Sequence, residues 1–350
     1  MRVLLALLLL IPSLSWGLTF KDGKQVNSST NSNDDSNKVP ANNKKKEQKY
    51  LDPNYVFKGH EKLKWIEEIG NWSMLETHDR ISQNPWNLRY ETNVVRNGKY
   101  SLRFEMHDSD CHEGDCPRGK RKGAMGRSEV TISNSLSKKY DHDHGEHWYA
   151  WSMYIPKETT YHKGWTILGQ FKETSVSKER NKKYKECENN DVGLRLGFKL
   201  QEQGLVLFRE ACYFKKNQDN PKYYQVEKII LTTKQLKNRE DRWIDFLMHV
   251  NWSYEEDGFI NLWLNDKKAY EYEGINSSIP VKYKGKLPGV LFRFGIYNGF
   301  RSKPLPPQVI YYDAFKRGTE CKVVSQFYDC EMIKESKLDP TEQLLEDLGF

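Results

Sequence analysis

The chain has 350 residues, and its 55 basic and 48 acidic side chains leave a net charge of +7. Aromatic residues make up 13% of the chain, a share that excludes a disordered protein and a coiled coil. It favours a strand-rich fold, and surfaces that stack on flat ligands such as sugar rings. A basic excess this small excludes a histone-like partner of nucleic acid, and the length allows one large domain or two modest ones.

The first 17 residues have the composition of a secretory signal peptide. Arg2 supplies the positive start, residues 3–14 form an apolar run, and Ser15-Trp16-Gly17 is a small-x-small cleavage site. The apolar run is short for a bilayer span, so a membrane anchor is the less favoured alternative. No later stretch reaches the ~18 apolar residues that a span needs. We therefore expect an exported protein, secreted or periplasmic.

Composition divides the remainder of the chain. Residues 18–50 have almost no apolar side chains, and we expect a flexible polar leader there. The folded domain is expected over residues 51–330, followed by a tail over residues 331–350. In this tail, Asp339 is a candidate N-cap for a short helix that has Pro340 at its first position, Glu342 in a capping box, and runs to Leu348.

Alternation of apolar and polar residues dominates the folded part. Turn residues at 255–258 and 264–266 mark a hairpin. Many short strands with few helical segments predict an all-β fold, a two-sheet sandwich or β-jelly roll. We expect strands at residues 100–106, 127–133, 148–155, 166–172, 193–200, 205–209, 244–252, 259–264, 291–297 and 308–315.

The chain has six cysteines, an even number that favours disulfides in an exported protein. The simplest pattern is short-range pairing: Cys111–Cys116, Cys187–Cys212 and Cys321–Cys330. A zinc site at Cys111 and Cys116 is the less favoured alternative, because no second Cys/His pair lies at zinc-finger spacing.

Successive strand residues point to opposite faces, so each strand divides into two sets. One set is apolar and faces the expected core: Leu102, Phe104, Met106, Val130, Ile132, Ile167, Phe171, Phe292, Phe294 and Ile296. The opposite set is mostly cationic, amide and phenolic: Arg103, Glu105, Arg127, Glu129, Thr131, Thr166, Leu168, Gln170, Lys172, Leu291, Arg293, Gly295 and Tyr297. Such a face is either an ordinary solvated surface or a surface that orients an anionic or hydroxylated ligand.

Three of these strands resemble the signature strands of alginate-lyase-type polysaccharide lyases. They are GRSEVT at 126–131, ILGQFKE at 167–173 and LFRFGIYNG at 291–299. Other segments resemble the heparin-lyase-I-like branch of that family: EGDC at 113–116, HWYAWSMYIP at 147–156, RWIDFLMHVNWS at 242–253, GFINLWLND at 258–266 and QVIYYDAFKRG at 308–318. The ordered set, over roughly residues 100–318, is more specific than any single motif.

The resemblance implies a concanavalin-like β-jelly roll with a concave groove for acidic polysaccharide. It also implies β-elimination at a uronic acid, in which the sugar carboxylate must be neutralised before a base removes the C5 proton. By this resemblance Arg127 and Gln170 neutralise the carboxylate, and Tyr297 donates a proton to the leaving oxygen and can also serve as the base. The substrate-binding residues expected on these strands are Arg103, Glu129, Arg293 and Asn298.

One residue departs from the family pattern. Lys172 occupies the position of a histidine, and a lysine with its ordinary pKa near 10.4 is a poor base at neutral pH. Burial or neighbouring cations can lower that pKa. Otherwise Tyr297 serves as both acid and base, or a histidine elsewhere supplies the base. The nearest candidate histidines are His142, His144 and His147; the alternative is that they are surface histidines or an adventitious metal site. His249 is expected to be structural.

A basic insertion at about residues 173–192 follows the Gln170 strand. Its candidate polyanion-binding residues are Lys178, Arg180, Lys182 and Lys183, and the resemblance gives the insertion the role of the basic thumb of heparin-lyase-like enzymes. A solvated charge run is the alternative. Attraction of this kind to a polyanion weakens with salt.

These patterns predict an exported, monomeric polysaccharide lyase that acts on a uronate-containing polysaccharide, with or without sulfate groups. A non-catalytic carbohydrate-binding jelly roll is the first alternative, and a hydrolase ranks below it because no pair of carboxylates lies at i and i+4 on the expected face. No cofactor is required. Asp313 is a weak candidate ligand for a structural Ca²⁺, and an ordinary strand-edge acid is the preferred interpretation.

Overall fold

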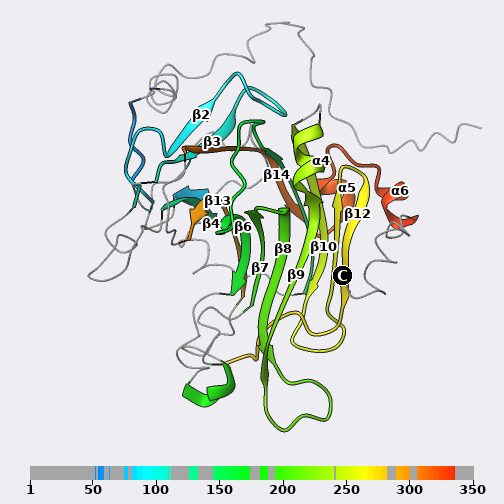
Figure 1. Cartoon of the computed structure of the whole chain (residues 1–350). Helices are drawn as coiled ribbons and strands as arrows, with labels where there is room; N and C mark the ends of the chain where they lie inside the picture. The colour runs from blue at the N-terminus through cyan, green and yellow to red at the C-terminus, as the bar shows by residue number, and fades with distance from the viewer. Residues whose placement is uncertain are drawn as a thin grey trace, which may run out of the picture. The chain divides into compact units, whose positions relative to one another are not determined.

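The computed structural model describes residues 52, 54–58, 63, 75–77, 81–108, 110–111, 126–132, 145–173, 182–187, 194–239, 242–281, 289–299 and 306–335. Within these residues the chain folds into two antiparallel sheets of seven strands each (Figure 1). This confirms the predicted all-β jelly roll. The predicted signal peptide, the polar leader and the tail helix at 340–348 lie outside the described residues.

The first sheet carries the three strands with the signature motifs side by side. Arg293 on the central of these strands pairs with Thr131 on one neighbour and with Gln170 on the other. The order across the sheet is β1 (Leu75–Thr77), β4 (Arg127–Ile132), β13 (Val290–Asn298), β6 (Thr166–Glu173), β7 (Arg195–Gln201), β8 (Gly204–Tyr213) and β9 (Lys222–Thr232).

The second sheet packs against the first. Its β11–β12 hairpin turns at Asn265 and Asp266, whose positive φ values of 47° and 68° match a two-residue turn of the type I′ kind. Its order is β12 (Lys267–Glu273), β11 (Phe259–Leu264), β10 (Trp243–Trp252), β5 (Gly145–Tyr154), β14 (Gln308–Gly318), β3 (Ser101–Met106) and β2 (Leu88–Glu91).

Trp151 lies at the centre of the core between the sheets. Its ring stacks on Phe246 of the second sheet at 4.7 Å between centroids, and it contacts Phe292, Phe198 and Phe171 of the first sheet at 5.1, 5.4 and 6.1 Å. These aromatic residues all come from core-facing positions of the alternating pattern. Their burial fixes which face of the first sheet points away from the core.

A β-bulge in β6 corrects one predicted face. The register of β6 shifts between Ile167 and Gly169 against β7, so one extra residue is inserted there. Leu168 therefore packs in the main core cluster with Phe171, while Ile167 lies outside that cluster. The sequence analysis assigned Ile167 and Leu168 the other way round, because strict alternation takes no account of an inserted residue.

Short helices cover parts of both sheets. They are η2 (Lys185–Cys187), α4 (Thr233–Asn238), α5 (Cys321–Val324) and α6 (Cys330–Glu335). The last two pack on the outer face of the second sheet, where Val324 and Ile333 join Trp148, Leu247 and Trp263 in a separate apolar cluster. Because Ile333 is buried there, the packed structure extends past the expected boundary at residue 330.

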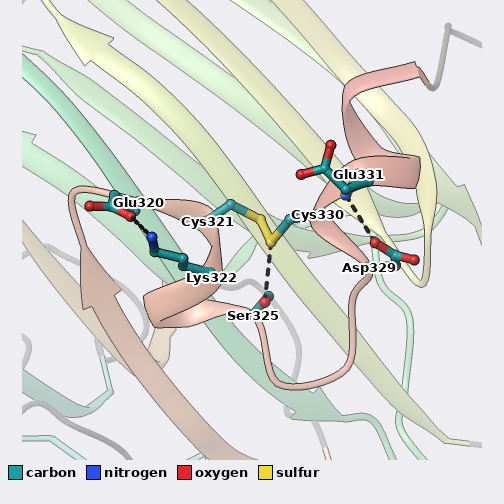
Figure 2. The surroundings of a disulfide bond; sticks show 7 residues. All are labelled: Glu320, Cys321, Lys322, Ser325, Asp329, Cys330 and Glu331. Carbon is teal, nitrogen blue, oxygen red and sulfur yellow. Dashed lines mark hydrogen bonds and ion pairs between the residues drawn. A yellow bond between two sulfur atoms is a disulfide. The ribbon is translucent and has the colours of Figure 1, made fainter. Parts of the chain in front are cut away.

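Two of the three predicted disulfides are confirmed. Cys187 bonds to Cys212, and Cys321 bonds to Cys330 (Figure 2), where Ser325 Oγ lies 3.2 Å from Cys330 Sγ. Cys111 is also disulfide-bonded, which excludes a zinc thiolate there, and its predicted partner Cys116 lies outside the described residues.

The search for membrane-crossing helices is negative for the described part of the chain, where no helix has the necessary length and hydropathy.

Candidate active site

One face of the first sheet gathers the polar residues singled out in the sequence. Tyr297 on β13 pairs with Arg127 on β4, and Gly295 pairs with Glu129. Paired residues on neighbouring strands project to the same face, and this face is opposite to Phe292, Phe294 and Ile296 in the core. We call it the polar face; its residues are Arg127, Glu129, Gln170, Lys172, Arg293 and Tyr297.

Glu129 joins the two predicted carboxylate-neutralising residues. Its Oε2 accepts a hydrogen bond from Arg127 Nη1 at 3.0 Å, and its Oε1 accepts one from Gln170 Nε2 at 2.9 Å. Glu129 itself is only 1% exposed. Its carboxylate orients Arg127 and Gln170, and its predicted contact with substrate stays a prediction.

Tyr297 is held between two side chains. The Arg127 guanidinium lies 4.0 Å from the centre of the phenol ring, and Trp165 contacts the ring edge-on at 5.3 Å between centroids. Gly299 makes room for Trp165, since a Cβ at this position would lie 2.4 Å from the indole. Tyr297 is half-buried, and its ring direction is set by these neighbours.

Lys172 has an altered proton affinity. Burial lowers its pKa from 10.5 to about 7, and the positive charges of Arg293, Arg127 and Arg195 act in the same direction, while Glu129 opposes them. At neutral pH a large fraction of this lysine is an uncharged amine, which can accept a proton. Lys172 and the Arg127–Tyr297 pair share one face of the sheet.

The polar face continues onto strands that the sequence analysis did not use. Arg195 of β7 pairs with Lys172 in the sheet and forms an ion pair with Glu210 of β8 at 2.6 Å, and Lys199 forms an ion pair with Glu227 of β9. Phe208 lies beside both cations, at 5.2 Å from the Arg195 guanidinium and 5.6 Å from Lys199 Nζ. The sequence pattern that could have indicated these cations is the alternation of Arg195 and Lys199 with the buried residues Leu196, Phe198 and Leu200.

The described part of the basic insertion is anchored at one end of the polar face. Cys187 is bonded to Cys212, which lies two residues beyond Glu210 on β8 and so shares its face. Lys182 and Lys183 are exposed in this segment. Lys178 and Arg180 lie outside the described residues, so their predicted role is not tested.

Comparison with known proteins assigns the family. A family model described as "Polysaccharide lyase" matches residues 67–316, which is most of the chain. The chain belongs to the polysaccharide lyase family. It is therefore an enzyme of the class that the sequence motifs predicted, and the non-catalytic alternative is set aside. No curated protein matches the chain.

Several solved structures resemble this polysaccharide lyase. The endo-β-1,4-glucuronan lyase from the fungus Trichoderma reesei has 14% identity and a TM-score of 0.47, over 68% of this chain and 88% of that one. The alginate lyase A1-II′, a member of polysaccharide lyase family 7, has 10% identity and a TM-score of 0.37, over 65% and 82%. The alginate lyase Aly36B has 10% identity and a TM-score of 0.39, over 67% and 84%.

Two predicted substrate-binding residues of this lyase lie away from the polar face. Arg103 is on β3 of the second sheet, where it forms an ion pair with Glu105 and lies 5.9 Å from the Tyr311 ring. Asn298 is 0% exposed, and its Oδ1 accepts a hydrogen bond from Thr166 Oγ1 at 2.7 Å. Alternation along one strand does not reveal which sheet the strand joins, which is why Arg103 lies on the second sheet. Asn298 directly follows Tyr297 on β13 and therefore points to the opposite face. The substrate-binding roles of both residues stay predictions.

The candidate histidine bases are also elsewhere. His147 and His249 lie on β5 and β10 of the second sheet. His249 stacks on Trp148 at 3.9 Å between ring centres and bonds Glu146 at 2.6 Å, in agreement with the expected structural role. His142 and His144 lie outside the described residues. Among the candidate bases in the described residues, Lys172 and Tyr297 lie on the polar face.

Asp313, the candidate calcium ligand, is fully buried on β14. Its carboxylate accepts backbone N–H bonds from Arg96, Asn97 and Ala314 at 2.7, 2.9 and 2.6 Å, and burial raises its pKa to about 7. No cluster of three or more His, Cys, Asp or Glu side chains suited to a metal occurs in the described residues. A structural Ca²⁺ stays an untested prediction.

Proposed function

We propose that this polysaccharide lyase is exported and cleaves a uronate-containing polysaccharide by β-elimination on the polar face. In this reaction a base removes the proton at C5, the C4–O bond breaks, and a C4=C5 double bond forms in the new non-reducing end. The leaving 4-oxygen takes up a proton and becomes a hydroxyl. No water is consumed.

The sugar carboxylate must lose its charge before the C5 proton becomes acidic. Arg127 and Gln170 are orientated by the buried Glu129, and Arg293 lies between their strands. A carboxylate that meets these donors is stabilised as the negative charge grows on it during proton removal. Glu129 acts as a positioning residue, since it accepts a hydrogen bond from each of the two donors.

Lys172 is the base in this proposal, and Tyr297 donates the proton to the leaving oxygen. The observation that carries it is the place of Lys172, on the same face as Tyr297 and paired with Arg195, where burial and neighbouring cations lower its pKa to about 7. A base whose pKa matches the working pH combines a useful neutral fraction with adequate proton affinity. The lowered pKa supports a lysine as the base in the place of the family's histidine.

Export of the protein is supported by its cysteines and its first residues. Disulfides persist in oxidising compartments, and Cys187–Cys212 and Cys321–Cys330 are both formed. The amino-terminal sequence has the three parts of a signal peptide. Exposed Lys182 and Lys183 beside the polar face favour a highly anionic chain, and the resemblance to heparin lyases makes sulfated uronates part of the substrate range to be tried.

The test is a screen of polyglucuronate, alginate and heparan sulfate for the ultraviolet absorbance of the unsaturated product. At least one should give a rising signal with the wild type, and with Tyr297→Phe at equal enzyme concentration the rate should be about 10²–10⁴-fold lower. A protein that binds these polymers and never produces unsaturated ends would refute the proposal.

A further inference from the structure

Behind the polar face, a buried threonine links the ends of three strands. Thr166, the first residue of β6, is paired in the sheet with Asn298, the last residue of β13. Asn298 follows Tyr297 along β13, so the side chains of Asn298 and its sheet partner point away from the polar face. On that side Thr166 contacts Gln308, the first residue of β14 in the second sheet. Thr166, Asn298 and Gln308 are all buried.

The Thr166 hydroxyl is the centre of this contact. It donates to Asn298 Oδ1 at 2.7 Å and lies 3.1 Å from Gln308 Oε1. His162 Nε2 also lies 3.1 Å from the hydroxyl oxygen. Within the described residues, Asn298 Nδ2 has no hydrogen-bond partner, so the bond from Thr166 is the one that holds this amide. A buried bond of this kind fixes its two groups, because breaking it leaves a polar atom without water.

Each partner in this bond is next in sequence to an aromatic residue of the candidate active site. Trp165 precedes Thr166, and Tyr297 precedes Asn298. Trp165 and Tyr297 make the edge-on contact at 5.3 Å between ring centroids. The Gly299 N–H also donates to the Trp165 carbonyl at 3.2 Å. The bond between Thr166 and Asn298 therefore sets the spacing of the two strand ends from which these rings project.

The end of β13 has little other support on its β6 side. The register between β13 and β6 is interrupted between Phe294 and Tyr297, and β13 ends one residue later. Beyond the interruption two pairs remain, Tyr297 with Ile167 and Asn298 with Thr166. The ends of paired segments open most easily, so a side-chain bond at this end has a large share in holding β6 and Trp165 in place.

We propose that Thr166 is a positioning residue for Tyr297 and acts through its hydroxyl group. By joining the ends of β6, β13 and β14, this hydroxyl holds Trp165 against the phenol ring and so keeps the Tyr297 hydroxyl directed at the leaving oxygen of the sugar. The proposal rests on the proposed function for the role of Tyr297. A catalytic group displaced by about 1 Å can lose about 10²-fold in rate, so a contact outside the reacting groups is sufficient to control turnover.

Two substitutions at Thr166 isolate the effect of the hydroxyl on turnover. Thr166→Val keeps the shape of the side chain and removes the hydroxyl, whereas Thr166→Ser keeps the hydroxyl and removes the methyl group. On a uronate polymer, Thr166→Val should lower kcat by about 10–100-fold and leave KM within about twofold of wild type. Thr166→Ser should keep kcat within about threefold of wild type. A serine variant that loses as much kcat as the valine variant would show that the methyl group matters instead, and would overturn the proposal.

The Trp165 indole reports the contact between the two rings in the absence of substrate. In ¹H–¹⁵N spectra of the full-length protein, the Trp165 Nε1–H signal is assigned by its loss in Trp165→Phe. Tyr297→Leu shows where this signal lies without the neighbouring phenol ring. Thr166→Val should move the signal towards that position, and Thr166→Ser should leave it in place. An unmoved signal in Thr166→Val overturns the proposal, and so does a moved signal with wild-type kcat.

Ser101→Ala is the matched control for the loss of a buried hydroxyl. Ser101 lies on β3 of the second sheet, where its hydroxyl donates to the Val94 carbonyl. The variant loses a comparable hydrogen bond, and its kcat and its Trp165 signal should stay as in wild type. A loss of kcat in Ser101→Ala equal to that in Thr166→Val would mean that general loosening of the fold lowers the rate, and would overturn the proposal.

Gln308→Met is the milder companion if Thr166→Val folds poorly. It removes the acceptor on β14 with little change in side-chain length, and it should lower kcat about three- to tenfold. Wild-type kcat in Gln308→Met and in every folded variant without the Thr166 hydroxyl overturns the proposal. Wild type without lyase activity would refute the proposed function, and the Trp165 signal would then still decide whether Thr166 holds the two rings together.

Discussion

Replacing Lys172 by methionine should stabilise the protein while abolishing its activity. Lys172 is a poorly hydrated cation close to Arg293, Arg127 and Arg195, and its pKa falls from 10.5 to about 7. At about 1.4 kcal/mol per pKa unit, this shift corresponds to at most about 5 kcal/mol of lost stability when the lysine is protonated. Methionine keeps the length of the side chain and removes the charge, so we expect a gain of about 2–4 kcal/mol in the free energy of unfolding at pH 6.

The gain should depend on pH in a defined direction. Between pH 7 and pH 10.5 the unfolded lysine binds more protons than the folded one, so wild-type stability rises with pH across that window. The advantage of Lys172→Met is therefore full below pH 7 and disappears towards pH 10.5. Urea unfolding of both proteins at several pH values measures the difference.

Lys199→Met is the matched control. Lys199 lies on the neighbouring strand β7, on the same face, but is paired with Glu227. Removing it should bring no stabilisation, because an exposed glutamate loses its partner. A Lys172→Met protein that is no more stable than wild type at pH 6, or a difference that does not change with pH, would refute the electrostatic reasoning.

Three further predictions concern turnover and binding. Tyr297→Phe should lower kcat by about 10²–10⁴-fold with polymer affinity unchanged, and a smaller loss would exclude Tyr297 as the proton donor. Glu129→Gln removes the negative charge that raises the pKa of Lys172, so this pKa should fall and the acid limb of the pH–rate profile should move to lower pH. A shift of the acid limb to higher pH would contradict the assigned charges. Neutralising Lys182 and Lys183 should raise KM and flatten its salt dependence with kcat nearly constant, and an equal fall in kcat would mean that the segment organises the polar face.

The position of a strand in its sheet decided which strands could be predicted. All ten predicted strands are internal to the two sheets, whereas the four that were missed, β1, β2, β9 and β12, are the four sheet edges. An edge strand has one unpaired side and more contact with solvent, so its sequence need not alternate cleanly. KYYQVEKIILT of β9 and KKAYEYE of β12 carry charges where an internal strand would carry apolar residues.

The candidate site was predictable where it followed alternation along a single strand. Arg127, Gln170, Arg293 and Tyr297 were placed correctly on one face, because their strands have a buried opposite face. The sheet to which Arg103 belongs and the bulge at Leu168 depend on pairing between distant strands, which one sequence does not specify. The same is true of the pKa of Lys172, whose causes lie on three other strands.

The pH dependence of unsaturated-product formation tests the role of Lys172 most directly. If the neutral amine is the base, wild-type kcat/KM should fall about tenfold per pH unit below a midpoint near 7. Lys172→Met should be inactive across the range, and Lys172→His should be active with a midpoint near that of imidazole, about 6.5. A Lys172→Met enzyme that keeps a tenth or more of wild-type activity, with an unchanged pH profile, would show that another group removes the proton.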